Sequence, residues 1–151
     1  MKLETATKFA ESLPDVTVGT KWRARTWMVS DRGFLWERPL GKTDIERLGD
    51  DPIPTGDIVG IIVESLDAKD ALLAMDLPGF FTIQHFNGYP GLLIELRLAQ
   101  AEHVRAAIEE AHRVAILKGP PKSRRKPAKK PAKKPAKKSA RKPAKKPKRK
   151  P

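Results

Sequence analysis

The sequence predicts a two-layer α+β domain with a mostly antiparallel sheet, followed by a disordered basic tail. Three observations lead to this fold class. Apolar residues recur at helical spacing near both ends of the first 117 residues. The segments between them are short, rich in Val, Ile, Thr and Trp, and separated by turn signals, which is typical of antiparallel sheets. The stretch 118–151 holds no acid and no large apolar side chain, so it cannot form a core.

The first 40 residues predict one helix and three strands. The helix should end near Leu13, because Pro14 follows it. Its apolar positions are Leu3, Ala6, Phe9, Ala10 and Leu13. The strands are expected at 18–22, 26–30 and 33–38. The break Ser30-Asp31-Arg32-Gly33 predicts a hairpin turn in which Gly33 adopts the positive φ.

The rest of the domain alternates short helices and strands. In chain order the sequence predicts a helix at 42–48, a loop at 50–56, a strand at 57–64, a helix from Asp67 to Met75, strands at 80–83 and 92–98, and a helix at 101–117. Asp67 is expected to cap its helix. The last helix is amphipathic, with an apolar stripe at Val104, Ala107, Ile108, Ala111 and Ala115. The two terminal helices are therefore expected to cover one face of the sheet.

Charge divides the chain into two regions, a domain at 1–117 and a tail at 118–151. The tail carries 18 of the 31 basic residues and none of the 18 acidic ones. The domain is left with 13 basic and 18 acidic groups, a net charge of −5, while the tail is +18. Such asymmetry is typical of a folded body that carries a basic interaction arm.

Composition excludes several classes of protein. The chain has no cysteine, which rules out disulfide frameworks and thiolate metal sites. The longest apolar stretch, Ile58 to Val63, is far shorter than the roughly 20 residues that span a bilayer. The first 15 residues contain Glu4 and Glu11 and no continuous apolar core, unlike a signal peptide. We therefore expect a soluble cytoplasmic protein.

The tail repeats the motif Pro-Ala-Lys-Lys from residue 127 onward. Proline at every fourth position prevents a helix, so the tail is expected to be disordered. Paired lysines suit a polyanion, and because Lys does not read base edges, binding should be led by phosphate and independent of base sequence. The expected nucleic-acid contacts are Lys122, Arg124, Arg125, Lys126, Lys129, Lys130, Lys133, Lys134, Lys137, Lys138, Arg141, Lys142, Lys145, Lys146, Lys148, Arg149 and Lys150.

The tail also has alternative interpretations. The simplest alternatives are a tail that only improves solubility and a patch that binds a membrane surface. The sequence shows no amphipathic helix or lipidation motif of the kind that usually accompanies a membrane-binding patch. DNA is favoured as the partner, and RNA is the alternative polyanion. The repeat also resembles the tails of linker histones and of extended bacterial HU proteins, which bind DNA.

Six domain residues are candidate contacts: Trp22, Arg23, Arg25, Trp27, His85 and Tyr89. Trp22 and Trp27 would face opposite sides of one unbroken strand, so at least one is expected in the core. The other could stack on a base beside Arg23 and Arg25, or all three tryptophans of the chain, Trp36 included, could pack in the core. His85 could contact a ligand in a groove or act as a base, or its ring could hydrogen-bond the turn backbone.

No catalytic or metal constellation is visible in the sequence. His103 and His112 lie nine positions apart, on opposite sides of one helix, so they should not share a metal. No His-x-x-x-His motif, Walker loop or dinucleotide glycine pattern occurs. We expect neither an enzyme nor a cofactor.

The stretch DLPGFFTIQHFNGYPGLLIELRLAQAEHVRAAIEEAHRVA (76–115) resembles the C-terminal signature of the MmcQ/YjbR family. In that family a Phe-Phe-Thr strand and a turn with His-[Phe/Tyr]-x-Gly-[Tyr/Phe]-Pro precede a long helix. VGTKWRARTWMV and RGFLWERPLGKTDIERLG resemble its first hairpin, so the likeness covers roughly residues 3–117. This chain departs from the family at His112, often Trp there, and at Gln100-Ala101, often Asp-Pro.

The MmcQ/YjbR resemblance implies a CyaY-like α+β fold and DNA binding. Combined with the tail, it leads us to expect a nucleoid-associated DNA-binding protein. The alternative is a protein–protein adaptor or small-ligand module that the tail tethers to RNA or ribosomes. A frataxin-like iron role would need an acidic ridge that the first helix lacks, and fold analogy does not transfer function. The sequence does not indicate an oligomeric state.

Overall fold

The computed structural model describes residues 1–122, and the part of the predicted tail from Ser123 onward lies outside the described residues. Met1–Pro121 forms one compact unit. Its elements are α1 (Leu3–Glu11), β1 (Thr17–Lys21), β2 (Ala24–Val29), β3 (Arg32–Glu37), α2 (Lys42–Leu48), β4 (Ile58–Ile62), α3 (Leu66–Ala74), β5 (Phe80–Phe81), the 3₁₀ turn η1 (Gln84–Phe86), β6 (Gly91–Glu95) and α4 (Ala101–Lys118).

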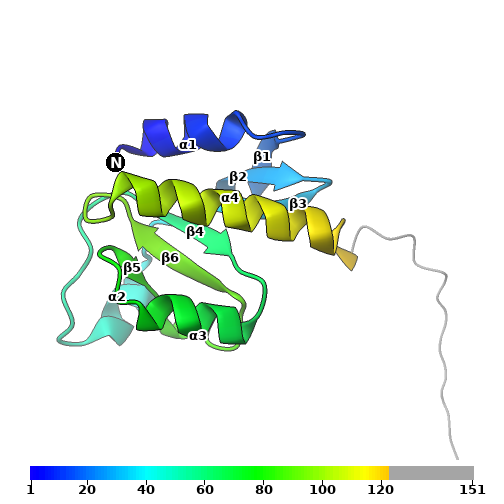
Figure 1. Ribbon diagram of the computed structural model, residues 1–151. Coiled ribbons are helices and arrows are strands. Elements are labelled where there is room, and N and C mark those ends of the chain that lie inside the picture. Colours follow the sequence, from blue (N-terminus) through cyan, green and yellow to red (C-terminus); the bar gives the residue numbers. More distant parts are fainter. Residues whose placement is uncertain (123–151) are drawn as a thin grey trace, which may run out of the picture. The chain divides into compact units, whose positions relative to one another are not determined.

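The strands form one sheet in the order β1-β2-β3-β4-β6-β5, and every neighbouring pair is antiparallel. In Figure 1, α4 crosses in front of the sheet, with α1 beside it and α3 below it. Helix α4 contacts β2, β3 and β4 and packs against α1. These features confirm the predicted α+β fold, in which the two terminal helices cover the same face.

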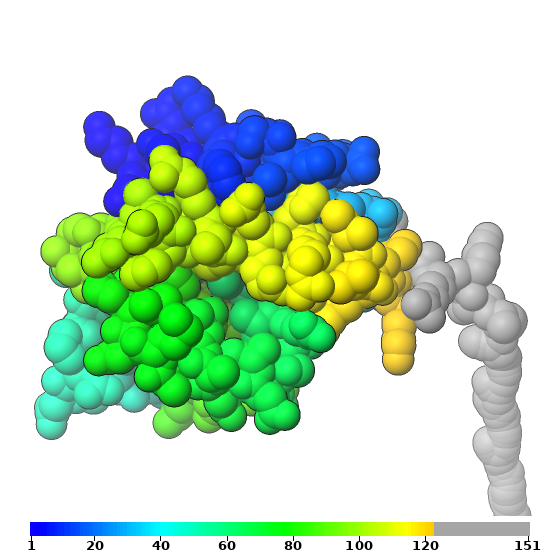
Figure 2. Space-filling view, viewed as in Figure 1, coloured from blue at the N-terminus to red at the C-terminus, as the bar shows by residue number. Residues whose placement is uncertain are grey.

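The core lies between this helical layer and the sheet. All five residues of the predicted apolar stripe on α4 are buried. Ala6 and Ala10 of α1 are fully buried beside them, which lets the two helices approach closely. Two long-range polar contacts support this packing. Trp27 Nε1 on the sheet donates to Glu11 Oε2 of α1 at 2.9 Å, and His112 Nε2 of α4 lies 2.8 Å from the Pro14 carbonyl oxygen in the loop after α1. Figure 2 shows the helices closing over this face of the molecule.

The two hairpin turns differ from the prediction. Ser30 and Asp31 adopt the positive φ values, 52° and 66°, whereas Gly33 lies inside β3, so the prediction for Gly33 was wrong. The first hairpin turns at Trp22 and Arg23, with φ values of 50° and 65°. Trp22 was predicted to end the strand at 18–22, and this prediction was wrong. Both are two-residue turns of the kind that right-handed strand twist favours.

A β-bulge in β3 sets the direction of the side chains that follow it. Trp27 pairs with Leu35 and Met28 pairs with Gly33, which leaves Phe34 as the extra residue. Phe34 and Leu35 are both fully buried, and the Phe34 ring meets the His112 ring edge-on at 5.4 Å. Trp36 then points to the opposite face of the sheet from Leu35.

One helix cap was predicted, Asp67 for the helix that corresponds to α3, and this prediction was wrong. Ser65, not Asp67, caps α3, because Ser65 Oγ accepts a hydrogen bond from the Ala68 amide at 3.1 Å. Asp67 lies in the first turn instead, where a negative charge complements the helix dipole. The bounds predicted for α2 are confirmed, and α4 ends at Lys118, one residue later than predicted. Among the described residues, no helix is both long and apolar enough to cross a bilayer.

Candidate functional site

A groove of about 550 Å³ opens between the β1–β2 turn, the end of β3 and the loop that contains η1. Its walls are mainly aromatic, and its rim carries cationic side chains. The lining residues are Trp22, Arg23, Ala24, Trp36, Glu37, Arg38, Pro39, His85, Phe86 and Tyr89. The volume lies within the range of small-ligand sites, about 300–1,000 Å³.

The aromatic wall rests on two glycines of adjacent strands. A Cβ on Gly60 would lie 2.4 Å from the Trp36 indole, and one on Gly91 would lie 2.6 Å from the Tyr89 ring. Gly60 pairs with Leu93, and Ile62 pairs with Gly91, so both glycines lie on one face of the sheet. The missing side chains therefore leave room for two rings to lie against the backbone.

Three of the wall's rings pack against each other. Trp36 lies 6.4 Å from Phe86 and 6.5 Å from Tyr89, and Phe86 meets Tyr89 at 5.5 Å and 80°. The Trp36–Tyr89 and Phe86–Tyr89 pairs are edge-to-face, and such pairs contribute roughly 0.5–1.5 kcal/mol each beyond their buried area. The cluster is therefore a rigid wall. Burial raises the pKa of Tyr89, although Arg32 opposes the shift, so its hydroxyl is neutral at physiological pH.

Lys69 of α3 holds the loop that carries this wall. Its buried Nζ donates to the carbonyl oxygens of Phe86 at 2.6 Å and Tyr89 at 3.0 Å. Burial lowers the pKa of Lys69, and the nearby Asp70 opposes the shift. Two carbonyls from one loop and one buried amine thus fix the positions of Phe86 and Tyr89 relative to α3.

Arg38 is oriented by Asp44 at the rim of the groove. Arg38 NH2 lies 3.0 Å from Asp44 Oδ2, and its guanidinium carbon lies 5.8 Å from the centre of the Phe86 ring. Asp44 also accepts a hydrogen bond from the Gly41 amide at 3.0 Å, which caps α2. Burial acts to raise the pKa of Asp44, but the Gly41 hydrogen bond and Arg38 outweigh it, so this pKa falls below its usual value.

Four of the six domain residues singled out in the sequence line this groove: Trp22, Arg23, His85 and Tyr89. The structure does not bring the other two there. Trp27 is fully buried in the core, and Arg25 pairs with Glu37 at 2.8 Å while its guanidinium covers the Trp27 ring at 4.9 Å. The alternative that all three tryptophans are core residues was wrong, because the Trp22 residue is 78% exposed.

The histidines take separate positions. His85 is exposed at the groove, and within residues 1–122 no hydrogen bond of its ring to the turn backbone is recorded. His112 is buried against Phe34, and His103 lies in a crevice between α3 and α4. The described part of the chain contains no group of His, Cys, Asp and Glu residues suited to hold a metal ion.

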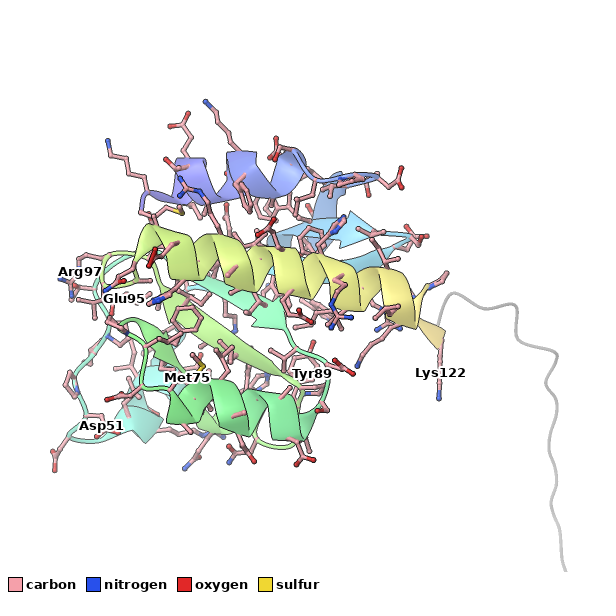
Figure 3. The ribbon with its side chains drawn as sticks, in the orientation of Figure 1. Asp51, Met75, Tyr89, Glu95, Arg97 and Lys122 are labelled. Carbon is pink, nitrogen blue, oxygen red and sulfur yellow. The ribbon has the colours of Figure 1, made fainter. Side chains whose placement is uncertain are left out.

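The remaining buried carboxylate serves the fold. Glu95 at the end of β6 accepts from the backbone amides of Thr55 and Gly56 at 3.2 and 3.1 Å, and from Arg97 Nε at 3.2 Å. Figure 3 shows Glu95 and Arg97 side by side, with Tyr89 at the other end of β6. Glu95 therefore secures the loop before β4 and takes no part in the groove.

The residues that the tail prediction names lie outside the described part of the chain, apart from Lys122. The end of α4 is nevertheless well defined. Arg32 Nε donates to the Gly119 carbonyl oxygen at 2.6 Å, which ties this end of the helix to the β2–β3 turn. The compact unit ends at Pro121, just beyond this contact.

Three mycobacterial proteins are similar to this chain. "Uncharacterized protein Rv2570" of Mycobacterium tuberculosis and "Uncharacterized protein Mb2600" of Mycobacterium bovis are each 44% identical over 89 residues. The match covers 56% of this chain and 67% of each relative. The chain belongs to the same family as these mycobacterial proteins. The names of these relatives assign them no activity, and no protein-family model matches the chain.

A solved structure shares the fold of this chain. The crystal structure of a Pseudomonas syringae protein, Northeast Structural Genomics Consortium target PsR293, matches with a TM-score of 0.59 and 16% identity. The match covers 76% of this chain and 99% of that one. At this level of identity the likeness is one of fold alone.

Sequence reasoning missed Arg38, Lys69 and the two glycines that shape the groove. In the sequence, Gly60 stands out only as an interruption of an apolar run. A glycine within a buried strand is itself a signal of close approach by another group, and that signal could have located the Trp36 wall. Lys69 carried no comparable signal, because a lysine on a short helix is usually a solvated one.

Proposed function

We propose that this protein binds DNA as a nucleoid-associated protein, with its basic C-terminal segment supplying affinity for phosphate. The observation that carries the proposal is the charge of +18 between residues 118 and 151, against −5 for the rest of the chain. Duplex DNA carries one charge per about 1.7 Å, and release of its counterions drives binding by clustered lysines. The resemblance to the MmcQ/YjbR family supports the same function.

The domain's charge supports a division of labour. A net −5 body repels a polyphosphate at long range, so the domain alone would be a weak phosphate binder. The groove adds two local cationic groups, Arg23 and Arg38, beside flat aromatic walls. The basic segment would thus hold the nucleic acid close while the domain contributes local contacts.

The direct test compares the full chain with a tail-neutral variant, in which every Lys and Arg from Lys122 to Lys150 is replaced by Gln. Gel shifts with several duplexes of unrelated sequence are the measurement. The full chain should shift all of them with similar midpoints, and the tail-neutral variant should not. Equal binding by the two proteins, or binding of only one duplex sequence, would contradict the proposal.

The alternative, an adaptor or small-ligand module tethered to RNA, is favoured by one observation: the groove has the volume of a ligand site. A salt titration of the full chain against duplex DNA and ribosomal RNA separates the two. Preference for DNA at physiological salt supports the nucleoid role. Preference for ribosomal RNA supports the alternative.

A further inference from the structure

Trp22 stands apart from the other aromatic residues of the groove. Trp36, Phe86 and Tyr89 pack on one another, whereas within residues 1–122 no aromatic partner of Trp22 is recorded. The Trp22 residue is 78% exposed, at the tip of a hairpin. A large indole in that position does little for the core, but it leaves a ring face free to stack.

The turn that presents Trp22 is also unfavourable for the fold. Trp22 and Arg23 both have positive φ, 50° and 65°, in a two-residue turn where Asn-Gly is preferred. Positive φ is unfavourable for bulky side chains, and such strain gathers at functional sites. The sequence thus keeps an indole and a guanidinium at this tip despite the cost to stability.

Cationic groups accompany the exposed ring. Among the described residues, no ion pair is recorded for Arg23, and Arg38 lies across the groove against Phe86. Trp22, Arg23 and Tyr89 therefore offer a planar group stacking surfaces and an adjacent anion a guanidinium. One ligand class that combines a flat base with a phosphate is a nucleotide.

We infer that the groove binds an unpaired base of a nucleic-acid strand, which gives the full chain a preference for single-stranded over duplex nucleic acid. This inference rests on the proposed function, because the basic segment of the same chain would supply the phosphate-led affinity for the strand. A base inside a duplex cannot enter without first being unpaired and unstacked, which opposes binding. Stacking tolerates any base, so this preference does not depend on sequence.

The test uses the full chain and a labelled oligothymidylate of about 12 nucleotides, within the site sizes of single-strand binding domains. Anisotropy is measured at roughly 0.3 M salt, where phosphate-led binding is weakened. Trp22→Ala should lower the affinity for this strand roughly tenfold or more, since stacking contributes about 1–3 kcal/mol per base. Trp22→Phe should retain a large part of it.

Val18→Ala is the matched control, because Val18 is exposed on β1, four residues from Trp22, and does not line the groove. It should bind the strand like the unchanged chain. A duplex of the same length gives the second arm, and Trp22→Ala should bind it at low salt as tightly as the unchanged chain. Urea midpoints of the variants establish that both remain folded.

The outcomes separate the two proposals. If Trp22→Ala and Val18→Ala bind the strand equally, or if Trp22→Ala weakens strand and duplex alike, the inference is overturned while the proposed function stands. If the unchanged chain binds neither strand nor duplex at low salt, both are overturned. A selective loss for the single strand supports the groove as a base site.

Discussion

The indole of Trp36 lies so close over Gly60 that a Cβ on the glycine would be 2.4 Å from the ring. The two residues pair across β3 and β4, and Trp36 lines the aromatic groove. Any side chain at position 60 must therefore displace the ring.

Gly60→Ala should destabilise the protein and disturb the groove. Inserting a methyl group into a packed contact costs roughly 1–3 kcal/mol, and here the obstructing group is a bulky buried ring. Urea unfolding should show the loss, and Trp fluorescence should shift as Trp36 moves. Gly41→Ala is the control, since nothing lies closer than 3.8 Å to a Cβ there. Equal stability of the two variants would mean that Trp36 does not depend on Gly60.

Lys69→Met should loosen the loop that carries Phe86 and Tyr89. The substitution keeps the apolar stem but leaves both carbonyl oxygens without their donor, at a cost of roughly 1–3 kcal/mol per buried group. Hydrogen exchange of the 84–91 amides should quicken. Lys8→Met is the matched control, because Lys8 is an exposed lysine on α1, and it should leave exchange in this loop unchanged. Equal exchange in the two variants would exclude the proposed role of Lys69.

The lowered pKa of Lys69 gives this side chain a pH signature. Its folded pKa lies below the 10.5 of a free lysine, so between the two values the unfolded chain binds more protons. The contribution of Lys69 to stability should therefore rise with pH over that alkaline window. Subtracting the urea profile of Lys69→Met from that of the unchanged chain isolates this contribution. A difference that falls with rising pH would contradict the assignment.

Asp44→Asn should flatten the acid limb of the stability curve. The folded pKa of Asp44 lies below the 3.8 of a free side chain, so its contribution is complete above that pH and is lost as pH falls through the folded value. Unfolding midpoints measured from pH 5 downward should fall less steeply for Asp44→Asn. Asp51→Asn, at an exposed loop position, should follow the unchanged chain. Parallel curves for all three proteins would exclude a role for Asp44.

Relief of the strain in the β1–β2 turn should stabilise the fold and remove the proposed base binding. Replacing Trp22 and Arg23 by Asn and Gly supplies the residues that the turn prefers, and should stabilise the fold by about 1 kcal/mol or more. The same change should abolish the preference for single strands. Asp31→Gly should relieve similar backbone strain in the β2–β3 turn. Because Asp31 does not line the groove, this substitution should leave binding unchanged. A double variant that is less stable than the unchanged chain would show that the turn is not strained.

The spacing of apolar residues predicted nearly every helix and strand. The sequence predicted the groove only in part. The stripe on α4 and the alternation of apolar runs determined the two-layer arrangement, because burial of apolar faces decides both. The hairpin turns were misjudged: Gly33 was expected to adopt the positive φ that Ser30 and Asp31 adopt, and Trp22, which also has positive φ, was expected to end a strand. Turn propensity is a local preference that tertiary contacts override.

The groove depends on the register in which the strands pair, and that register cannot be read from the sequence. Trp36 reaches the groove face because the bulge at Phe34 shifts the phase of β3 by one residue. Trp22 and His85 were chosen from the sequence for their chemistry. That both line the same groove depends on the order of the strands in the sheet. Lys69 supports the groove only through hydrogen bonds to carbonyl groups 17 and 20 positions away in the sequence.

The salt dependence of duplex binding tests the central claim most directly. If the basic segment neutralises about six phosphates, the logarithm of affinity should fall linearly with the logarithm of salt, by roughly a thousandfold between 50 and 200 mM. The tail-neutral variant should lose this slope. A full chain whose affinity for duplex DNA is unchanged across that range would contradict the account.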